Sequence, residues 1–464
     1  MKYKCTVCGF IHEGNLNDGY ICPICRNSLH VFELITQEEK TYKMVKISKD
    51  NVCIDRIMEK CIDCGACKKI CENIVNVKYD IEKCGPICIG CGQCILNCPM
   101  GALTPKYDYR KVLDCIKDDN LIVAVMTSPA VRVSIGDAFG YANGEFLEKK
   151  MIGVLKEIGF DYVFDTAFGA DLTSVEEASE LLQRIEKGQK AMFTSCCPSW
   201  VKYASIYHPE LIENLSTCKS PIGMQSTIIK EYYAKNEGID PKKLVLVALT
   251  PCTSKKEEGL NTYVDYTITT SELSLLIREL NIDFKKVKDL EFDDVIGSSA
   301  GVMYGASGGV GTSVLRCLYY FMTNKDLKSN EIVENDCGFY KNIKVKIKDR
   351  IIKIAVVSTM GNLEKLLPIK DEFDLIEVMN CPGGCISGGG QVIMPANLKE
   401  ELKNERGKNL FKVDKKAEIR YPYKNPVVKS LYDDYLKEGC SELSEKLLHK
   451  KHEDLSHLLH IKKD

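Results

Sequence analysis

The chain has 464 residues, of which 45% are hydrophobic and 28% charged, and its formal net charge is −2. These values are ordinary for a globular protein, and the charge gives no reason to expect nucleic acid or an anionic membrane as a partner. No apolar run approaches the ~20 residues of a membrane span, and the opening MKYKCTVCGF lacks an apolar signal region, so we expect a cytoplasmic protein. The 24 cysteines stand out, because in a reducing compartment such thiols more often bind metals than form disulfides.

Residues 1–36 contain two Cys-x2-Cys pairs in a short, turn-rich stretch. The pairs are Cys5 with Cys8, and Cys22 with Cys25. Four thiolates from two such knuckles form a tetrahedral site for one metal. The stretch YKCTVCGFIHEGN…ICPICRNSLHVFELI resembles the rubredoxin-like domain of rubrerythrins, which implies a single redox-active iron. A structural zinc is the alternative, because the ligands alone do not choose between the metals. A charged linker follows at 37–50.

Residues 51–108 contain a duplicated cysteine motif. The first copy, C-x2-C-x2-C-x3-C, is Cys61, Cys64, Cys67 and Cys71, and the second is Cys88, Cys91, Cys94 and Cys98. This is the two-cluster ferredoxin pattern, in which three thiolates of one copy and the fourth of the other hold each [4Fe–4S] cluster. We therefore assign Cys61, Cys64, Cys67 and Cys98 to one cluster, and Cys88, Cys91, Cys94 and Cys71 to the second. A pair of zinc ribbons or simply buried thiols is the alternative.

Residues 109–464 change to apolar runs that alternate with helical patterns, which indicates an α/β domain. Four runs suit strands buried on both faces: Leu121–Met126, Leu244–Leu249, Ile352–Val357 and Leu375–Met379. Thr173 followed by Glu176 predicts a capping box at a helix start. Residues 424–464 predict two helical segments that pack on this domain, and their His/Lys-rich end predicts a solvated helix face.

Three loops of this domain carry a further set of cysteines. They are FTSCCPSW with Cys197, TPCTSKKEE with Cys252, and EVMNCPGGCISGGGQ with Cys381 and Cys385. The loops follow apolar stretches, and in open α/β sheets ligands gather at the carboxyl ends of the strands. In this order the loops resemble the three signature motifs of [FeFe]-hydrogenases. The stretches SPAVRVSIGDAFG, VFDTAFGADLTSVEEASELLQRIE and SAGVMYGASGGV also read like that family, and the resemblance covers roughly residues 51–440.

The resemblance implies a large α/β catalytic domain of two lobes around an H-cluster, in a multidomain chain with the rubredoxin-like and ferredoxin-like modules before it. The H-cluster is a [4Fe–4S] cube joined to a diiron unit that bears CO, cyanide and a dithiolate bridge. By position, Cys197, Cys252, Cys381 and Cys385 would hold the cube, with Cys385 bridging to the diiron unit. Lys255 would hydrogen-bond a cyanide, and Met379, Ser128, Pro129 and Thr250 would line the diiron pocket. Thr250 departs from the methionine that many members have, and we expect it to shift catalysis toward hydrogen oxidation.

The same resemblance implies a proton relay. Cys196 matches the thiol that relays protons, and a free thiol can be tuned toward neutrality. The remaining relay groups would be Glu177, Ser216 and Glu180, with Arg184 near the surface end. Glu177 and Glu180 are three apart, so a helix places them on neighbouring parts of one face. A solvated helix face is the alternative for two such glutamates.

The predicted function is reversible oxidation of hydrogen, H2 = 2 H+ + 2 e−. A ferredoxin or a similar small electron carrier is the expected partner, and dedicated maturation proteins would assemble the diiron unit. Two alternatives on the same fold are a hydrogen sensor, which usually adds signalling domains and loses relay groups, and a non-catalytic iron–sulfur assembly protein, which lacks the full diiron environment.

Overall fold

The computed structural model describes residues 2–7, 11–34, 44–45, 47–77 and 87–460. The chain forms two compact units, Met1–Met44 and Val45–Asp464. The boundary falls within the linker predicted at 37–50, most of which lies outside the described residues. No boundary separates the ferredoxin-like segment from the α/β region, so these two predicted domains belong to one unit.

The first unit is a small antiparallel sheet in the order β2-β1-β3. Its strands are β1 (Lys2–Cys5), β2 (Ile11–Glu13) and β3 (Phe32–Leu34). The ring of Tyr20 packs between His12 and Phe32. With so few apolar residues, this unit has little core of its own, and a bound metal would add substantially to its stability.

The second unit begins with the cysteine-rich segment. Strand β4 (Ile54–Arg56) pairs in antiparallel fashion with β5 (Leu103–Pro105). Helices α1 (Ala66–Asn73) and α2 (Gln93–Leu96) pack against each other, and each starts after a glycine with positive φ. A left-handed residue here turns the chain sharply, so that the cysteine loop leads directly into the helix.

A four-stranded parallel sheet forms one half of the catalytic region, in the order β10-β9-β6-β7. Its strands are β6 (Ile122–Thr127), β7 (Tyr162–Asp165), β9 (Leu244–Thr250) and β10 (Tyr266–Thr269). One face packs on α3 (Tyr109–Ile116), α4 (Glu148–Ile158) and α10 (Thr270–Glu279). The other face packs on α5 (Thr166–Glu186) and α7 (Pro221–Ile228).

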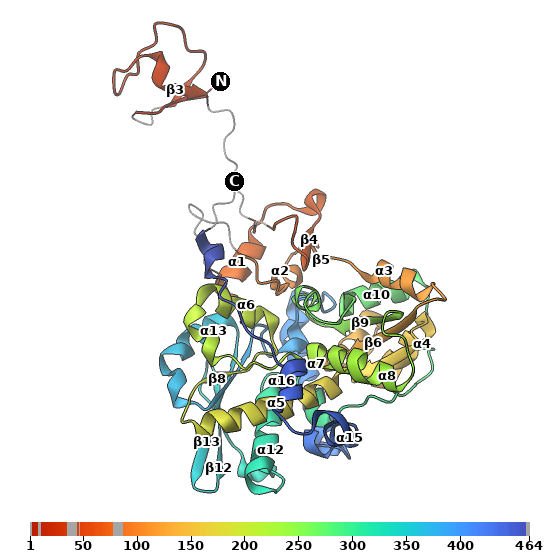
Figure 1. The fold of residues 1–464 in the computed structure, drawn as a ribbon. Helices are drawn as coiled ribbons and strands as arrows, with labels where there is room; N and C mark the ends of the chain where they lie inside the picture. Colours follow the sequence, from red (N-terminus) through yellow and green to blue (C-terminus); the bar gives the residue numbers. More distant parts are fainter. Residues whose placement is uncertain (1, 8–10, 35–43, 46, 78–86, 461–464) are drawn as a thin grey trace. The chain divides into compact units, whose positions relative to one another are not determined.

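A five-stranded mixed sheet forms the other half, in the order β11-β12-β13-β14-β8. Its strands are β8 (Met192–Phe193), β11 (Val333–Asp336), β12 (Lys341–Ile347), β13 (Arg350–Ser358) and β14 (Leu375–Met379). Helices α6 (Pro198–Tyr207) and α13 (Met360–Leu366) pack on one face. Helices α5 and α12 (Gly309–Thr323) pack on the other, so α5 lies between the two sheets (Figure 1).

All four strands predicted from apolar runs are present, and β8, β9 and β14 lead directly into the cysteine loops. The predicted helix start at Thr173 is wrong. Helix α5 begins seven residues earlier, because the side chain of Asp165 accepts a hydrogen bond from the Ala167 amide and caps the helix there. Thr173 lies inside the helix, where its hydroxyl donates to the Gly169 carbonyl.

The remaining α-helices described in the unit are α8 (Ala234–Asn236), α9 (Lys255–Gly259), α11 (Ser299–Met303), α14 (Lys399–Lys416), α15 (Pro426–Leu431) and α16 (Glu442–Leu448). The helical segments predicted near the C-terminus are α15, which continues as a π-helical turn, and α16. None of the described helices is long and apolar enough to cross a membrane.

The solvated helix face predicted for the His/Lys-rich end is confirmed only in part. Residues 449–455 are not helical, although Lys451, Glu453 and Asp454 are exposed, and Ser456–His460 form a 3-10 helix. His449 pairs with the buried carboxylate of Glu176 at 3.1 Å, and His452 donates to the Ser216 carbonyl at 2.8 Å. These buried partners tie the start of the segment to the domain.

Candidate active site

The three cysteine loops meet at one cavity between the two sheets. Cys252 follows β9, Cys381 and Cys385 follow β14, and Cys197 follows the short strand β8. Strands β14 and β8 run parallel in one sheet, and β9 lies in the other, parallel sheet. The loops therefore leave the carboxyl ends of strands from both sheets, where ligands gather in α/β folds. The four candidate cluster ligands of these loops all line the cavity.

Burial raises the pKa of each of these four thiols, and that of Cys252 rises to about 11. For Cys252, Cys381 and Cys385, the second cause is repulsion from a neighbouring cysteine of the set. Four thiolates would thus be costly here without a compensating positive charge. A bound iron centre supplies that charge, since the thiolate is the form that ligates metal.

Lys255 brings a fixed cation to the wall of this cavity. It lies at the start of α9, and its Nζ donates to the Cys196 carbonyl at 3.2 Å and to Glu258 Oε2 at 2.5 Å. Burial opposes the charged form of Lys255, yet the Glu258 carboxylate keeps its pKa above the ordinary value. Ser220 also donates to Glu258, at 2.9 Å, and so fixes the partner of the lysine.

The residues expected around a diiron unit also reach this cavity. Its wall includes Ser128, Pro129, Thr250 and Met379. Ser128 and Pro129 follow β6, Thr250 ends β9, and Met379 ends β14. The hydroxyl of Thr250 accepts from the amide of Cys252 at 3.3 Å, so it braces the loop of a candidate ligand.

The candidate relay residues form a line from the cavity toward the surface. Cys196 lines the cavity, and burial, followed by the charge of the Glu177 carboxylate, raises the pKa of its thiol. Glu177 is fully buried in α5, where its Oε1 accepts from the Ser195 amide at 3.3 Å. Its Oε2 has no partner among the described residues, and burial raises its pKa to about 8. A carboxyl group tuned this way can take and release a proton near neutral pH.

The outer part of this line is hydrogen-bonded throughout. Ser216 donates to Glu180 Oε2 at 2.9 Å, and Arg184 donates to Glu180 Oε1 at 2.7 Å. Arg184 also donates to the Leu215 carbonyl, and its side chain retains 15% of its exposure. The solvated face that was the alternative for Glu177 and Glu180 is therefore wrong, because both side chains are buried.

The cysteine-rich segment forms a second, apolar cavity. Cys71, Cys88, Cys91 and Cys94 line it together with Ile54, Ile70, Val75, Val77 and other apolar residues. These are the four cysteines that the motif assigns to one cluster. In the other set, the Arg56 guanidinium donates to the sulfurs of Cys61 and Cys67, at N–S distances of 3.7 and 3.9 Å. Cys64 is exposed, and the Cys98 sulfur accepts from the Ala102 amide at 3.3 Å.

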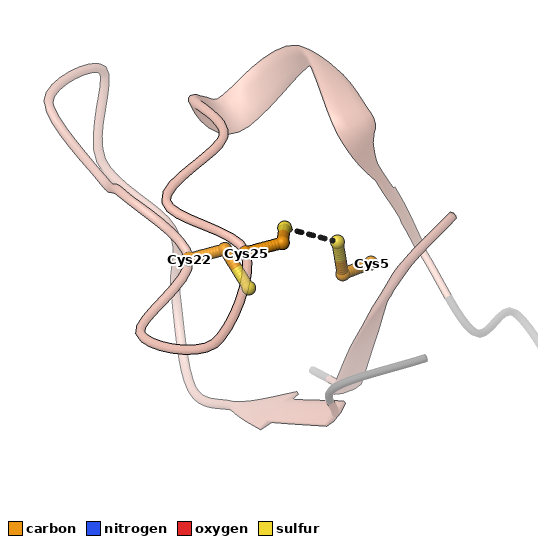
Figure 2. Close-up of side chains that lie close together, drawn as sticks. All are labelled: Cys5, Cys22 and Cys25. Atoms are coloured by element: carbon orange, nitrogen blue, oxygen red, sulfur yellow. Dashed lines mark hydrogen bonds between the residues drawn. The ribbon is translucent and has the colours of Figure 1, made fainter. Parts of the chain in front are cut away.

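In the first unit, Cys5, Cys22 and Cys25 point toward a common centre (Figure 2). The sulfurs of Cys5 and Cys25 are 3.5 Å apart. Hydrogen bonds from Asn27 lower the pKa of Cys25 to about 6, which favours its thiolate. Cys8 lies outside the described residues.

The sequence did not single out three residues that the structure places at the site. Glu258 is three residues after Lys255, so helical spacing could have revealed it. Asn380 lies between Met379 and Cys381, and it lines the cavity. Gln93 comes from the ferredoxin-like segment, 288 residues before the cysteine it contacts, so no local pattern could indicate it.

Comparisons with known proteins agree with this site. Residues 121–389 match the family described as "Iron only hydrogenase large subunit, C-terminal domain", and residues 400–455 match "Iron hydrogenase small subunit". The NADP-reducing hydrogenase subunit HndD of Solidesulfovibrio fructosivorans is 36% identical over 85% of this chain and 74% of its own length. Iron hydrogenase 1 of Clostridium pasteurianum is 35% identical over 97% of this chain and 83% of its own.

Solved structures agree as well. The [FeFe]-hydrogenase structure of HydA(deltaEFG), solved in a study of stepwise H-cluster assembly, superposes with a TM-score of 0.66 at 31% identity. It covers 75% of this chain and 99% of that one. A more distant similarity, 28% identity over 71% of this chain and 85% of the other, links it to the cytosolic Fe-S cluster assembly factor narfl of Danio rerio.

The fold and the thiol-lined cavity define an iron–sulfur oxidoreductase. This chain belongs to the iron-only, or [FeFe], hydrogenases, whose members act on hydrogen at an H-cluster. The residues present fit that group. The cavity offers the four candidate ligand thiols, the Cys196 thiol and one buried ammonium, and both polar atoms of the Asn380 side chain are buried there with no partner among the described residues. An unpaired buried amide is costly unless a bound group or water satisfies it.

Proposed function

We propose that this hydrogenase catalyses the reversible reaction H2 = 2 H+ + 2 e− through the buried cavity between its two sheets. The observation that carries the proposal is the convergence of three cysteine loops on one cavity whose wall also holds Lys255. Cys197, Cys252, Cys381 and Cys385 would hold the cube, and Cys385 would bridge to the diiron unit. When bound, the H-cluster supplies the open iron position at which hydrogen reacts and the reservoir for its electrons.

The surrounding side chains orient the cofactor and exclude water. Lys255, fixed by Glu258, would donate to a cyanide, since the ammonium is buried and already directed along the cavity wall. Met379, Ser128 and Pro129 would pack against the diiron unit. Thr250 brings a small side chain to the same wall, and its hydroxyl is engaged with the Cys252 amide.

Proton transfer would run from Cys196 through Glu177, Ser216 and Glu180 toward Arg184. The support for this order is geometric. Cys196 lies at the cavity, Ser216 donates to Glu180, and Arg184 pairs with Glu180 at the partly exposed end. Glu177 lies between them, and with a pKa of about 8 it is mostly protonated at pH 7 while still able to release its proton.

Electrons would enter and leave through two [4Fe–4S] clusters in the ferredoxin-like segment. We assign Cys71, Cys88, Cys91 and Cys94 to the cluster in the second cavity, and Cys61, Cys64, Cys67 and Cys98 to the other. Cys5, Cys8, Cys22 and Cys25 would hold one iron in the rubredoxin-like unit, or zinc as the alternative. A ferredoxin-type carrier in the cytoplasm is the proposed partner, and maturation proteins would supply the diiron unit.

The alternative of a non-catalytic assembly protein has support from the relatives at 25–28% identity that are named as such factors. The hydrogenase relatives share more residues, at 35–39%. The complete relay line in α5 and its neighbours favours a catalyst over a hydrogen sensor.

The test is hydrogen evolution from a reduced viologen dye by protein produced anaerobically with hydrogenase maturation proteins. Turnover that disappears in Cys385→Ala, while iron at the other clusters stays near the wild-type amount, would support catalysis at this cavity. Wild-type protein with full iron loading and no turnover would refute it, and slow turnover with full cofactor loading would favour a sensor.

A further inference from the structure

A buried side-chain amide of the ferredoxin-like segment contacts one of the H-cluster loops. Gln93, the first residue of α2, lies between Cys91 and Cys94 and is 3% exposed. Its Nε2 donates to the Cys381 sulfur at 3.1 Å and to the Ser387 carbonyl at 2.9 Å. A carbonyl oxygen only accepts, so the Ser387 contact requires the NH2 end of the amide to face both groups.

The backbone just before Gln93 packs closely against two of the H-cluster loops. Thr253 donates to the Gly90 carbonyl and Ser254 donates to the Ile89 carbonyl. A Cβ added to Gly92 would lie 2.5 Å from the Thr253 hydroxyl, and one added to Gly389 would lie 2.3 Å from the Cys91 carbonyl. This packing holds the two loops in close contact, and the hydrogen bond from Gln93 to the Cys381 sulfur spans them.

We propose that Gln93 is a positioning residue that raises the reduction potential of the cube held by Cys381, because its amide donates a hydrogen bond to the ligating sulfur. The inference rests on the proposed function, since it requires the cube. A reduced cluster carries one more negative charge than the oxidised form, and a donor at its sulfur stabilises that extra charge. Gln93 also lies within the cysteine motif of the neighbouring cluster. The reduction potential of the cube would therefore depend on a residue of the segment that holds its electron donor.

The experiment compares the full-length, matured wild type with Gln93→Leu and Gln93→Asn. Leucine removes both donors at similar volume, and asparagine keeps an amide that is too short to reach the sulfur. Infrared bands of CO and cyanide, recorded while the applied potential is stepped, report the redox state of the H-cluster alone, separately from activity. We expect the midpoint for cube reduction to shift to lower potential in both variants.

Gln391→Leu is the matched control. Gln391 is a glutamine of similar burial on the loop after Cys385, but its amide donates to the carbonyls of Ala130, Cys385 and Ile386 and contacts no sulfur. Its midpoint should equal that of the wild type. An unshifted midpoint in Gln93→Asn, or an equal shift in Gln391→Leu, would overturn the inference while the hydrogenase function stands. Absence of CO and cyanide bands from the wild type would instead overturn the proposed function, and this inference with it.

Discussion

Replacing Glu177 with glutamine tests the proton path most sharply. Glutamine keeps the shape and the acceptor for the Ser195 amide, but it cannot release a proton at neutral pH. If Glu177 carries every proton between Cys196 and Ser216, turnover should fall about 10²–10⁴-fold, the usual size of a general acid–base contribution. The infrared bands of the H-cluster should stay at their wild-type positions, because Glu177 does not line the cavity.

The same substitution has a stability signature with a definite sign. The pKa of Glu177 is raised from 4.5 to about 8 by burial, so the folded state holds the proton more tightly than the unfolded state. Wild-type stability therefore declines as pH rises from 4.5 through 8, by up to ~1.4 kcal/mol per pH unit. Glutamine does not titrate in this range. The free energy of unfolding of Glu177→Gln, taken relative to that of the wild type, should therefore increase by about 2 kcal/mol when the pH is raised from 6 to 8.

Glu176→Gln is the matched control on the same helix. Glu176 is equally buried, but its carboxylate accepts from the Tyr432 hydroxyl and the Cys440 amide, away from the cavity. Its loss should lower the denaturant midpoint and leave turnover per loaded H-cluster near the wild-type rate. Dye-coupled hydrogen assays at equal infrared band intensity make the comparison. Turnover of Glu177→Gln within about threefold of the wild type would refute the relay through this residue.

Three further substitutions, one of them with a matched control, have definite outcomes. Arg132→Met leaves the buried Asp165 without its cation and should lower the free energy of unfolding by ~3–5 kcal/mol, whereas Arg110→Met at an exposed pair should cost under ~1 kcal/mol in chemical denaturation. Thr250→Met should lower the ratio of hydrogen oxidation to evolution rates, and an unchanged ratio would contradict a tuning role. Cys22→Ser should remove one metal equivalent by elemental analysis, and the element lost, iron or zinc, identifies the occupant.

Two of the three strands that carry the cysteine loops, β9 and β14, were predictable because they are buried on both faces, whereas the two-residue strand β8 was not predicted. Such strands appear in sequence as unbroken apolar runs, and Leu375–Met379 coincides with β14. The hairpin strand β12 was not predicted, although its alternating KNIKVKI pattern fits a strand with one buried face. The start of α5 was misplaced because two capping signals compete, and Asp165 caps the helix while Thr173 bonds back to its own helix.

The cysteine motifs indicated the site, but the residues that organise it come from distant parts of the chain. Gln93 reaches Cys381 from another module, and His449 reaches Glu176 from the C-terminal segment. Such contacts depend on how the elements pack, which a single sequence does not encode locally. The sequence pattern therefore indicated the candidate ligands but not the side chains that set their charge and hydrogen bonding.

The infrared spectrum of the anaerobically matured protein tests the central claim most directly. Only an H-cluster would give this chain intrinsic CO and cyanide vibrations. We predict sharp bands of both kinds that shift when hydrogen is admitted and that are lost in Cys385→Ala. A spectrum without such bands, from protein whose other clusters are fully loaded with iron, would contradict the assignment of the cavity and favour a non-catalytic iron–sulfur protein.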